Sequence, residues 1–357
     1  MKTDTRIITD FSTIDERDWE QLGHGDNPFL SRAFLHALEA SGSVNPATGW
    51  QAHHLAVFQD GQLAAFAPTY AKTHSHGEFV FDWAWADAYA RNGLNYYPKL
   101  LTAIPYSPVS GPRLLTRNSQ AGSRALSQIL LKLAVDECRR LDYSSWHCNF
   151  TTGPDEIVLD PADLLKRRDL QFHWFNRGYR SFDEFLQQLR SRKRKNIRRE
   201  RRQVQAAGIQ FEWKTGRELT AADLDFLYLC YCNTFRAHGN HAALRPEFFR
   251  MLAAGLGDRM HMAIASRQDM PVAMGMFLSG GGRLYGRYWG CIEEIPGLHF
   301  ETAYYQGIEY CIEHGIDVFE SGAQGEHKIS RGFVPAQTTS YHLIRHEAFR
   351  AAIGDAL

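Results

Sequence analysis

The sequence predicts an α/β protein with mixed sheets, built from two modules that repeat one order of elements. Apolar runs typical of strands occur in two groups, and each group is followed by a long amphipathic stretch and one more apolar run. The chain has 357 residues, the length of two domains of ordinary size. Hydrophobic residues make up 44% and charged residues 22%, which is enough apolar material for two full cores.

The first half of the chain contains the first copy of this order. It begins with an amphipathic helix within residues 27–42. Two apolar runs follow and flank Asp60-Gly61, a dipeptide that favours a tight hairpin turn. The remaining expected elements are strands in 77–83 and 101–115, a helix at about 121–141 and a closing strand over 143–150.

The second half repeats the order after a connecting helix. A capping signal, Ser181 with Glu184, and a stop at Gly208 predict that this helix spans 182–207, a length of about 39 Å. A second capping signal at Thr220 starts the next helix. The copy then continues with strands in 260–266, 271–279 and 283–290, a helix over 299–314 and a closing strand over 316–320. The expected modules are residues 1–175 and 176–357.

Charge and targeting signals narrow the class of protein. Lys plus Arg and Asp plus Glu both number 40, so no global field attracts nucleic acid or anionic lipid. The N-terminus lacks the apolar region of a secretory signal, and no stretch has the length and hydropathy of a membrane span. The six cysteines form no CxxC pair, which favours reduced thiols. We therefore expect a cytoplasmic protein without membrane insertion.

Residues 192–202 read RKRKNIRRERR, and two interpretations of this run differ in where its cations point. A solvated helix face or a nucleic-acid arm is the simpler one. On a helical wheel, however, some of the cations lie close to the apolar stripe, and guanidinium groups suit phosphate and carboxylate. We favour an anion-binding helix that faces a cleft. The cations expected to bind are Lys193, Arg194, Arg198 and Arg201, and those expected to point away are Arg192, Lys195, Arg199 and Arg202.

The segment 322–335, GAQGEHKISRGFVP, follows the closing strand that ends at Glu320. Open α/β sheets bind ligands beyond the carboxyl ends of their strands. Gly322 and Gly325 allow close approach of a substrate, and the segment carries both signs of charge. A solvated loop is the alternative, but the density of ionisable groups favours an active site. Its candidate residues are Glu320, Gln324, Glu326, His327, Lys328 and Arg331.

The strand RLYGRYWG, residues 283–290, supplies further candidates. Arginines and aromatic residues alternate along one face of it, an arrangement that suits a substrate cleft or an exposed sheet edge. The residues expected on this face are Arg283, Tyr285, Arg287 and Trp289.

In residues 74–89 aromatic side chains also alternate, and we expect Phe79 and Phe81 on the core face of a strand. Asp82 lies on the opposite face and is a substrate-binding candidate. His74, His76 and Glu78 have a spacing that zinc could use, but no fourth ligand is evident nearby, so we expect no metal.

The chain resembles a bacterial family of N-acyltransferases, labelled Fem-like or peptidoglycan biosynthesis/recognition and related to the GNAT superfamily. The segments that carry the resemblance span nearly the whole chain and include NPFLSRAFLHALEASGSV, HSHGEFVFDWAWADAY, SRKRKNIRRERR and FESGAQGEHKISRGFVP. The resemblance implies two GNAT-like modules in tandem, with the basic helix opening the second. It also implies transfer of an acyl or aminoacyl group, as in the enzymes that build peptidoglycan cross-bridges.

One segment departs from the pattern of acetyl-CoA-dependent relatives. Those enzymes carry a [QR]xxGx[GA] loop before the crossover helix, and its backbone N–H groups hold the pyrophosphate. Here the corresponding residues, 291–300, read CIEEIPGLHF, with two glutamates and a proline. The donor is then acyl-CoA held differently, aminoacyl-tRNA or an acyl-carrier thioester.

The leading hypothesis is an N-acyltransferase that acts on an amine of a peptidoglycan precursor or a small molecule. Its chemistry needs a base, an oxyanion site and a proton for the leaving group. We expect Glu320 or Glu326 as base, His327 as alternative base or acid, and Gln324 with the Gly325 backbone at the oxyanion. Lys328 and Arg331 would bind a phosphate or carboxylate. The alternatives are a non-catalytic binding module for a glycopeptide or nucleotide-linked ligand, and a tRNA-binding role for the basic helix.

Overall fold

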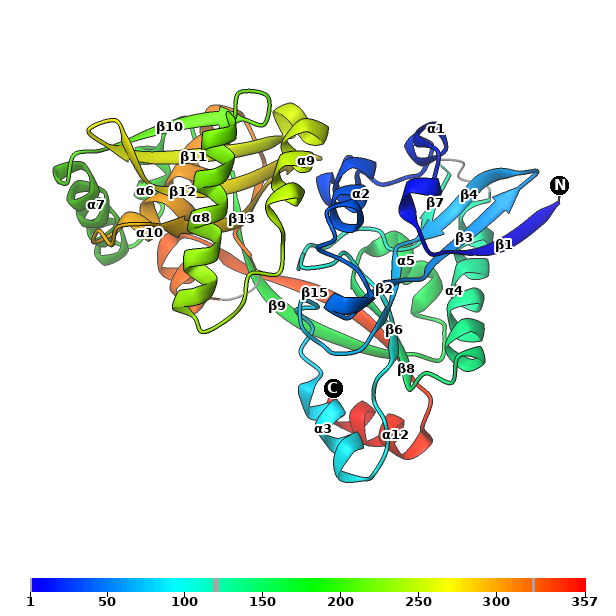
Figure 1. Ribbon diagram of the computed structural model, residues 1–357. Helices are drawn as coiled ribbons and strands as arrows, with labels where there is room; N and C mark the ends of the chain where they lie inside the picture. Colours follow the sequence, from blue (N-terminus) through cyan, green and yellow to red (C-terminus); the bar gives the residue numbers. More distant parts are fainter. Residues whose placement is uncertain (1, 118–121, 323–324) are drawn as a thin grey trace. The chain divides into compact units, whose positions relative to one another are not determined.

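The computed structural model describes residues 2–117, 122–322 and 325–357 and divides into two compact units (Figure 1). Unit 1 comprises residues 1–169 and 337–357, and unit 2 comprises residues 170–336. The chain passes between the units within two strands, β9 (Leu165–Phe175) and β15 (Val334–Ile344). The expected second module, 176–357, therefore differs from unit 2 at its end, because β15 pairs with β8 and returns the last residues to unit 1.

Unit 1 contains two groups of paired strands. In the first the order is β1-β3-β4-β7, and Asp60-Gly61 forms the predicted turn between β3 and β4. In the second the order is β15-β8-β6-β5-β2. The strands are β1 (Thr3–Ile8), β2 (Trp50–Ala52), β3 (His54–Gln59), β4 (Gln62–Ala67), β5 (Thr69–Lys72), β6 (Lys99–Thr102), β7 (Leu115–Thr116) and β8 (Ser145–Thr151). The helices are α1 (Glu16–Glu20), α2 (Arg32–Ala40), α3 (Trp83–Arg91), α4 (Ser123–Arg140), α5 (Gly153–Leu159) and α12 (Glu347–Ala356).

Unit 2 contains strands in the order β10-β11-β12-β13-β14-β9. They are β10 (Ile209–Thr215), β11 (Met260–Arg267), β12 (Met270–Gly280), β13 (Arg283–Cys291) and β14 (Val318–Glu320). The helices are α6 (Phe182–Gln187), α7 (Ser191–Ala206), α8 (Ala221–Ala237), α9 (Pro246–Leu256), α10 (Leu298–Phe300) and α11 (Gln306–Glu313). A π-helix, Glu301–Tyr305, joins α10 to α11, and a 3₁₀ helix, η6, spans Glu326–Arg331.

Each unit contains one parallel strand pair joined by a helical crossover, which is the repeat predicted from the sequence. In unit 1, β6 pairs with β8 through α4, and in unit 2, β13 pairs with β14 through residues 298–313. An antiparallel strand lies beside each closing strand: β15 beside β8 and β9 beside β14. Since β9 follows β8 in the chain and β15 follows β14, each unit receives its last strand from the other half.

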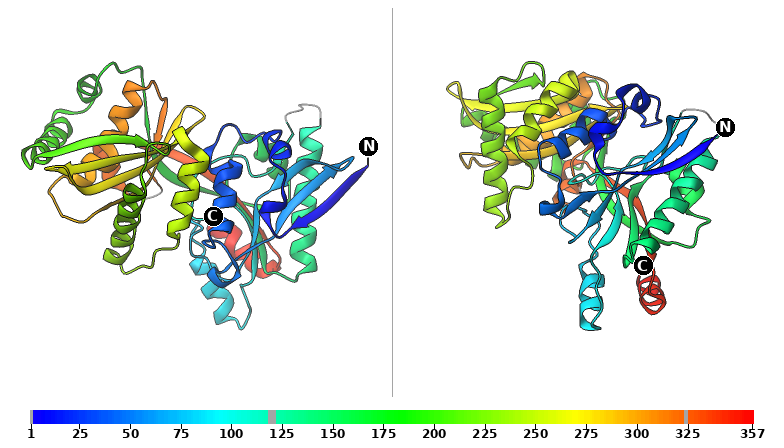
Figure 2. Two further views of the ribbon diagram at one scale, coloured as in Figure 1. Left: turned by 45° about the horizontal axis from the view of Figure 1, so that its top comes forward. Right: turned by 45° about the vertical axis from the view of Figure 1, so that its right-hand side comes forward.

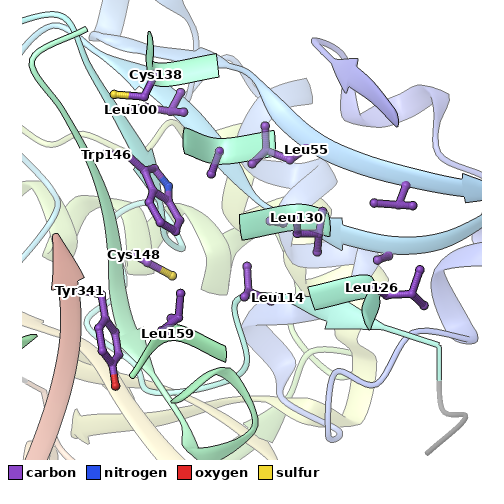
Figure 3. Packing of buried hydrophobic residues seen from close by; sticks show 14 of the residues in the cluster. Leu55, Leu100, Leu114, Leu126, Leu130, Cys138, Trp146, Cys148, Leu159 and Tyr341 are labelled. Carbon is purple, nitrogen blue, oxygen red and sulfur yellow. The ribbon is translucent and has the colours of Figure 1, made fainter. Parts of the chain in front are cut away.

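The crossover helices are held by apolar faces. In unit 1, Leu126 and Leu130 recur at helical spacing on α4 and pack with Leu55, Leu100 and Trp146 of the strands (Figure 3). The helix α4 lies along β3 and β4 (Figure 2). In unit 2, the crossover helix buries Tyr305 and Ile308 against strand residues such as Phe277 and Phe319. Burial of these side chains fixes the closing strands, and hence the segments that follow them.

The strand expected in 77–83 is wrong. These residues form no strand, and α3 begins at Trp83. The alternation is present but inverted, because Glu78 and Asp82 are buried while Phe79 and Phe81 are exposed. Lys99 of β6 donates to Glu78 Oε2 at 2.8 Å and to Asp82, and this pairing compensates the burial of two carboxylates. The strand expected in 101–115 is likewise reduced to the ends of that range, β6 and β7.

The single helix expected over 182–207 is also wrong, because α6 ends at Gln187 and α7 starts at Ser191. Arg190 has extended backbone angles, φ −59° and ψ 145°, that interrupt the helix. Ser181 accepts a hydrogen bond from the Glu184 N–H as expected, but the Glu184 carboxylate accepts from the Arg180 N–H instead of completing the capping box.

Candidate functional site

The strands β13 and β14 of unit 2 are paired over three residues only, and Tyr285 with Glu320 is the last pair. Beyond this pair the two strands enclose a cavity of about 140 Å³, lined on one side by residues 286–289 and on the other by Ser321. Gly286 is one of its lining residues, and a Cβ there would lie 3.2 Å from the Phe319 ring. The predicted site after the closing strand therefore borders a cavity.

A β-bulge in β13 changes which side chains share a face. Its pairing with β12 shifts between Met276 and Phe277, so that Arg287 has no residue opposite it. Arg283 and Tyr285 then share a face with Tyr288, whereas Trp289 lies on the other face. The prediction that Arg283, Tyr285, Arg287 and Trp289 share one face is wrong, because regular alternation ends at the bulge. Tyr285 is buried, and Arg287 lies over the ring of Tyr288.

Glu320 is 5% exposed and lies at the end of β14. Arg283 Nη1 donates to its Oε1 at 2.6 Å, and His173 Nε2 on β9 lies 3.8 Å from its Oε2. Burial raises the pKa of Glu320 to about 7, against the lowering effect of Arg283 and Arg287. Burial, Arg283 and Lys328 lower the pKa of His173 to about 4, so this imidazole is neutral at pH 7. Glu320 can accept a proton near neutral pH.

Lys328 of η6 is 2% exposed. Its Nζ donates to two backbone carbonyls that follow β14, Ser321 O at 2.9 Å and Gly322 O at 2.8 Å. No carboxylate among the described residues forms an ion pair with it, and burial lowers its pKa to about 8. An ammonium group has three N–H donors, so one remains for a ligand.

His327 lies beside the cavity in contact with Tyr304 of the π-helix. The Tyr304 hydroxyl and His327 Nε2 are 2.9 Å apart, and Tyr304 lines the cavity. Burial, Arg331 and Lys328 lower the pKa of His327, while burial raises the pKa of Tyr304 to about 12. The hydroxyl of Tyr304 therefore stays protonated at neutral pH and can donate.

Two further rings line the same cavity. Trp289 stacks on His299 with ring centroids 4.7 Å apart.

Arg331 is 7% exposed and holds η6 in place. Its Nη1 donates to His327 O at 3.0 Å, and its Nη2 donates to Glu200 Oε1 of α7 at 2.9 Å. The guanidinium also lies 3.4 Å above the centre of the Phe300 ring. The Tyr305 hydroxyl donates to the second oxygen of Glu200. Arg331 thus has a carboxylate partner within unit 2.

The basic helix α7 turns Lys193 and Arg201 toward the body of unit 2, as the wheel predicts, but both have protein partners. Lys193 Nζ donates to Ile329 O at 2.9 Å, and Arg201 donates to Glu301 at 3.1 Å and Glu309 at 2.7 Å. Arg198 is exposed and pairs with Asp183 at 3.0 Å. Arg194 is half-buried and forms no ion pair with the described residues. Arg192, Lys195, Arg199 and Arg202 are also exposed.

A second cavity of unit 2, about 650 Å³, lies beside the start of the crossover helix and shares Trp289 and His299 with the first. Glu293 and Glu294 line it, and no lysine or arginine among the described residues does. Arg267 pairs with Glu293 at 2.6 Å. The residues here do not fit the pyrophosphate of coenzyme A, because carboxylates stand where an anion would bind.

Two predicted site residues have side chains that the structure does not describe, and a third residue lies in unit 1. Gln324 lies outside the described residues, and so does the side chain of Glu326. Asp82 lies in unit 1, where the Tyr96 hydroxyl donates to it at 2.6 Å and Lys99 pairs with it. Burial would raise the pKa of Asp82, but Lys99 and His147 hold it below its usual range. Among the described residues, no group of three or more His, Cys, Asp or Glu side chains could hold a metal ion.

Sequence reasoning missed His173, His299, Ser321 and Tyr304. His173 reaches Glu320 because β9 pairs with β14, and pairing between segments so far apart in the chain leaves no local signal. Tyr304 and His299 lie on the crossover helix, five residues apart, and the π-helix between them places both at the cavity. The one available signal was the cluster of aromatic and histidine residues after Pro296-Gly297.

Comparison with known proteins shows the family and the fold of the chain. The family described as peptidoglycan biosynthesis/recognition, FemAB-like, matches residues 10–357. The crystal structure of FemX is similar, with a TM-score of 0.54, 11% identity, and coverage of 98% of this chain and 100% of that one. The C-terminal domain of a putative lysylphosphatidylglycerol synthetase from Agrobacterium fabrum gives 0.56 and 10%, covering 93% and 91%.

A third structure, L-PGS from Bacillus licheniformis, has a TM-score of 0.52 and 9% identity, covering 90% of this chain and 95% of that one. At such identities the similarity concerns the fold. Together with the observed topology it confirms the predicted mixed α/β fold. The curated proteins contain no match. None of the helices in the described ranges combines the length and apolar character that crossing a membrane requires.

Proposed function

The chain belongs to the FemAB-like family, and we propose that its second unit transfers an acyl or aminoacyl group from a carrier to an amine. The observation that carries this proposal is the cavity beyond the last β13–β14 pair, together with two groups that adjoin its lining residue Ser321 and titrate near neutral pH. Glu320 has its pKa raised to about 7 and Lys328 has its pKa lowered to about 8. Groups poised in this way are suited to proton transfer and charge stabilisation.

In the proposed reaction the amine nitrogen attacks the acyl carbon, a C–N bond forms, and the bond from carbon to the carrier breaks. Glu320 accepts the proton that the nitrogen loses. The free N–H of Lys328 donates to the oxygen that becomes negative, and such donors stabilise acyl-transfer transition states strongly. The Tyr304 hydroxyl gives a proton to the leaving group, and its hydrogen bond to His327 supplies the path for reprotonation.

Glu326 as an alternative base, and Gln324 with the Gly325 backbone as oxyanion donors, remain part of the proposal. These residues follow β14 within a few positions of the chain, and η6 begins at residue 326. Their closeness in sequence to Glu320 supports these roles. Arg331 and the inward cations of α7 take a supporting role instead of binding a free anion, since carboxylates or a backbone carbonyl already accept from them.

The acyl donor we favour is one that does not place a pyrophosphate at the crossover helix of unit 2. Aminoacyl-tRNA and an acyl-carrier thioester meet this condition, and acyl-CoA would have to be held differently. The exposed cations of α7 suit a tRNA backbone. A tRNA bound there would lose affinity as salt rises, because phosphate contacts release counterions. Affinity that does not change between 50 and 200 mM salt, about the range in which such contacts weaken, would contradict this donor.

For the acceptor we propose an amine on a peptidoglycan precursor or a related small molecule, with the cytoplasm as the place of reaction. FemAB-like membership supports the first, and the six free cysteines support a reducing compartment.

The decisive experiment is a turnover assay with purified full-length protein, charged tRNA, acyl-CoA and acyl-carrier thioesters as donors, and UDP-linked muropeptides and simple amines as acceptors. On the active pair, Glu320→Gln should lower kcat by about 10² to 10⁴, the usual contribution of a positioned base. Glu313→Gln is the matched control, because Glu313 is exposed on the same unit. Equal activity of both variants would contradict the assigned base.

A non-catalytic binding module is the second candidate, and the carboxylates at residues 293 and 294 favour it because they remove the usual cofactor subsite. Such a module would bind a glycopeptide or nucleotide-linked ligand in a thermal-shift screen without turnover. Its affinity would be unchanged in Glu320→Gln.

A further inference from the structure

Unit 2 contains a further cavity that the proposed reaction does not use. Its volume is about 270 Å³, and the residues that line it belong to β9, α6, α7, η6 and β15 and to the turns next to them. It shares no lining residue with the cavity beyond the last β13–β14 pair. A space of this size suits a small molecule, because ligand pockets of proteins begin at about this volume.

Aromatic rings form much of the wall of this cavity. The ring centroid of Trp174 lies 5.9 Å from that of Tyr179 and 5.7 Å from that of Phe185, and the last two are 5.7 Å apart. All three residues line the cavity. Rings in mutual contact hold one another in place, and a flat apolar body can pack against them face to face or edge to face.

The apolar lining also extends to the surface of the unit. Phe175, Ile329 and Val334 line the cavity, and they are 40%, 41% and 37% exposed. They belong to β9, η6 and β15, which are distant in sequence, so the fold brings them to one place. Exposed apolar side chains that are scattered singly need no explanation, whereas a group of them at one cavity is typical of a ligand-binding surface.

The charge of the cavity indicates the second property of its ligand. Arg177 and Lys193 line it, and no aspartate or glutamate among the described residues does. Arg177 is exposed, and its guanidinium forms no ion pair with the described residues. Lys193 supports η6 through its hydrogen bond to Ile329 O at 2.9 Å, and two of its three N–H donors remain. The cavity of about 650 Å³ in the same unit is lined by two glutamates instead. A ligand of this smaller cavity therefore carries negative charge.

We propose that this cavity binds a small aromatic carboxylate. The ring system of the ligand lies against Trp174, Tyr179 and Phe185, and its carboxylate accepts from Arg177 and Lys193. A guanidinium matches a carboxylate in a bidentate geometry, and a small organic acid fills a space that is too short for a larger anion with an apolar body. The site is separate from Glu320 and from the cavity that Ser321 lines, so this inference stands apart from the proposed transfer.

Calorimetric titration of the full-length protein at neutral pH with 2-naphthoate and with 2-naphthamide tests the site. The two compounds have nearly the same shape and differ in charge. 2-Naphthoate should bind at least about tenfold more tightly, the effect of one good charge-assisted hydrogen bond. Arg177→Gln should weaken the binding of 2-naphthoate by about tenfold for the same reason. Arg199→Gln is the matched control, because it removes an equal charge from an exposed position of α7 outside the cavity, and it should leave the affinity unchanged.

A second pair of variants locates the bound compound. Gln188→Glu adds a carboxylate to the cavity wall with almost no change of shape, and the position is exposed, so the variant should fold normally. It should weaken 2-naphthoate by about tenfold or more, because like charges are brought together. Gln187→Glu adds the same charge to the neighbouring exposed residue, which does not line the cavity, and should have little effect. Absence of binding, equal affinity for the two compounds, or equal effects of Gln187→Glu and Gln188→Glu would overturn the site.

Discussion

The ends of the two closing strands differ in what surrounds their buried polar groups. In unit 1, beyond the β6–β8 pair, Arg113 is completely buried and donates to Asn149 O at 2.8 Å, Gly111 O at 3.1 Å and Val109 O at 2.5 Å. Asp155 accepts from two backbone N–H groups of the same segment at 2.9 and 3.0 Å. In unit 2, Glu320 precedes Ser321, which lines a cavity, and the partners of Lys328 among the described residues are two carbonyls, one of them that of Ser321.

The difference shows how one architecture separates stability from chemistry. A buried cation most of whose donors bind backbone carbonyls stabilises the segment that wraps around it, and it has little left for a ligand. A buried cation that is incompletely paired carries a cost in folding, and it is the kind of group that an active site retains. We therefore expect substitutions in unit 1 to change the free energy of unfolding, and substitutions in unit 2 to change turnover.

The largest effect expected is that of Arg113→Ala. It leaves at least three buried carbonyls without donors, removes the cation near Asp155 and opens a cavity, so the free energy of unfolding should fall by about 3–5 kcal/mol. Urea unfolding followed by tryptophan fluorescence measures the change. Arg139→Ala, an exposed residue of the same unit, should change it by less than about 0.5 kcal/mol. A loss below about 1 kcal/mol for Arg113→Ala would contradict the stabilising role assigned to this buried cation of unit 1.

Glu320 should make stability depend on pH. Its pKa is raised from 4.5 to about 7, so the native state holds a proton that the unfolded state has lost between these values. The free energy of unfolding should therefore be highest near pH 4.5 and fall by about 3 kcal/mol toward pH 7 on account of this group. In Glu320→Gln this contribution should be absent. Parallel unfolding curves of both proteins at pH 5 and pH 8 provide the measurement, and equal differences at both values would contradict the raised pKa.

Residues 74–89 explain part of what sequence reasoning could and could not predict about the fold. The hairpin at Asp60-Gly61, the crossover helices and the closing strands follow from local periodicity, and these predictions are confirmed. Prediction from local periodicity failed where a distant charged residue determines which side chains are buried. Lys99 makes it favourable to bury Glu78 and Asp82 and to expose the aromatic residues between them. The exchange of β9 and β15 likewise depends on pairing between distant segments.

Lys328→Met distinguishes a role of Lys328 in stability from a role in turnover. Methionine keeps about the length of the side chain and removes its charge. No carboxylate among the described residues loses a partner, but Ser321 O and Gly322 O lose a donor, so the free energy of unfolding should fall by no more than about 2 kcal/mol. The kcat of the proposed transfer should fall about 100-fold, the effect of removing one oxyanion donor. Lys195→Met, an exposed change on α7, is the control and should retain full activity. A destabilised Lys328→Met with normal kcat would assign Lys328 to the fold.

For the candidate site, the sequence predicted which segment carries it but not which residues contact that segment. Glu320, His327 and Lys328 were predicted because a glycine-spaced, charged loop follows a strand, and in that segment Ser321 lines a cavity. The cations of α7 were assigned to a ligand because a helical wheel shows direction only. It does not show Glu301 and Glu309, which approach Arg201 from the crossover helix. The bulge at Arg287 is equally invisible in a strand pattern.

The smallest effect concerns Glu200, the one acidic residue of the basic run, which accepts from Arg331 and Tyr305. It touches no ligand in the proposed reaction, so we regard it as a positioning residue for η6. Glu200→Gln leaves the charge of Arg331 uncompensated, and Arg331 already lowers the pKa of His327. The pKa of His327, followed by NMR of its ring, should therefore fall further, by some tenths of a unit. The kcat should fall by less than about tenfold with KM unchanged, because only alignment is lost.

Glu212→Gln, an exposed change on β10, is the control and should alter neither the pKa of His327 nor kcat. A purely structural Glu200 would lower stability and leave the His327 titration where it is, so the titration decides whether the basic helix of unit 2 tunes the site or only supports it.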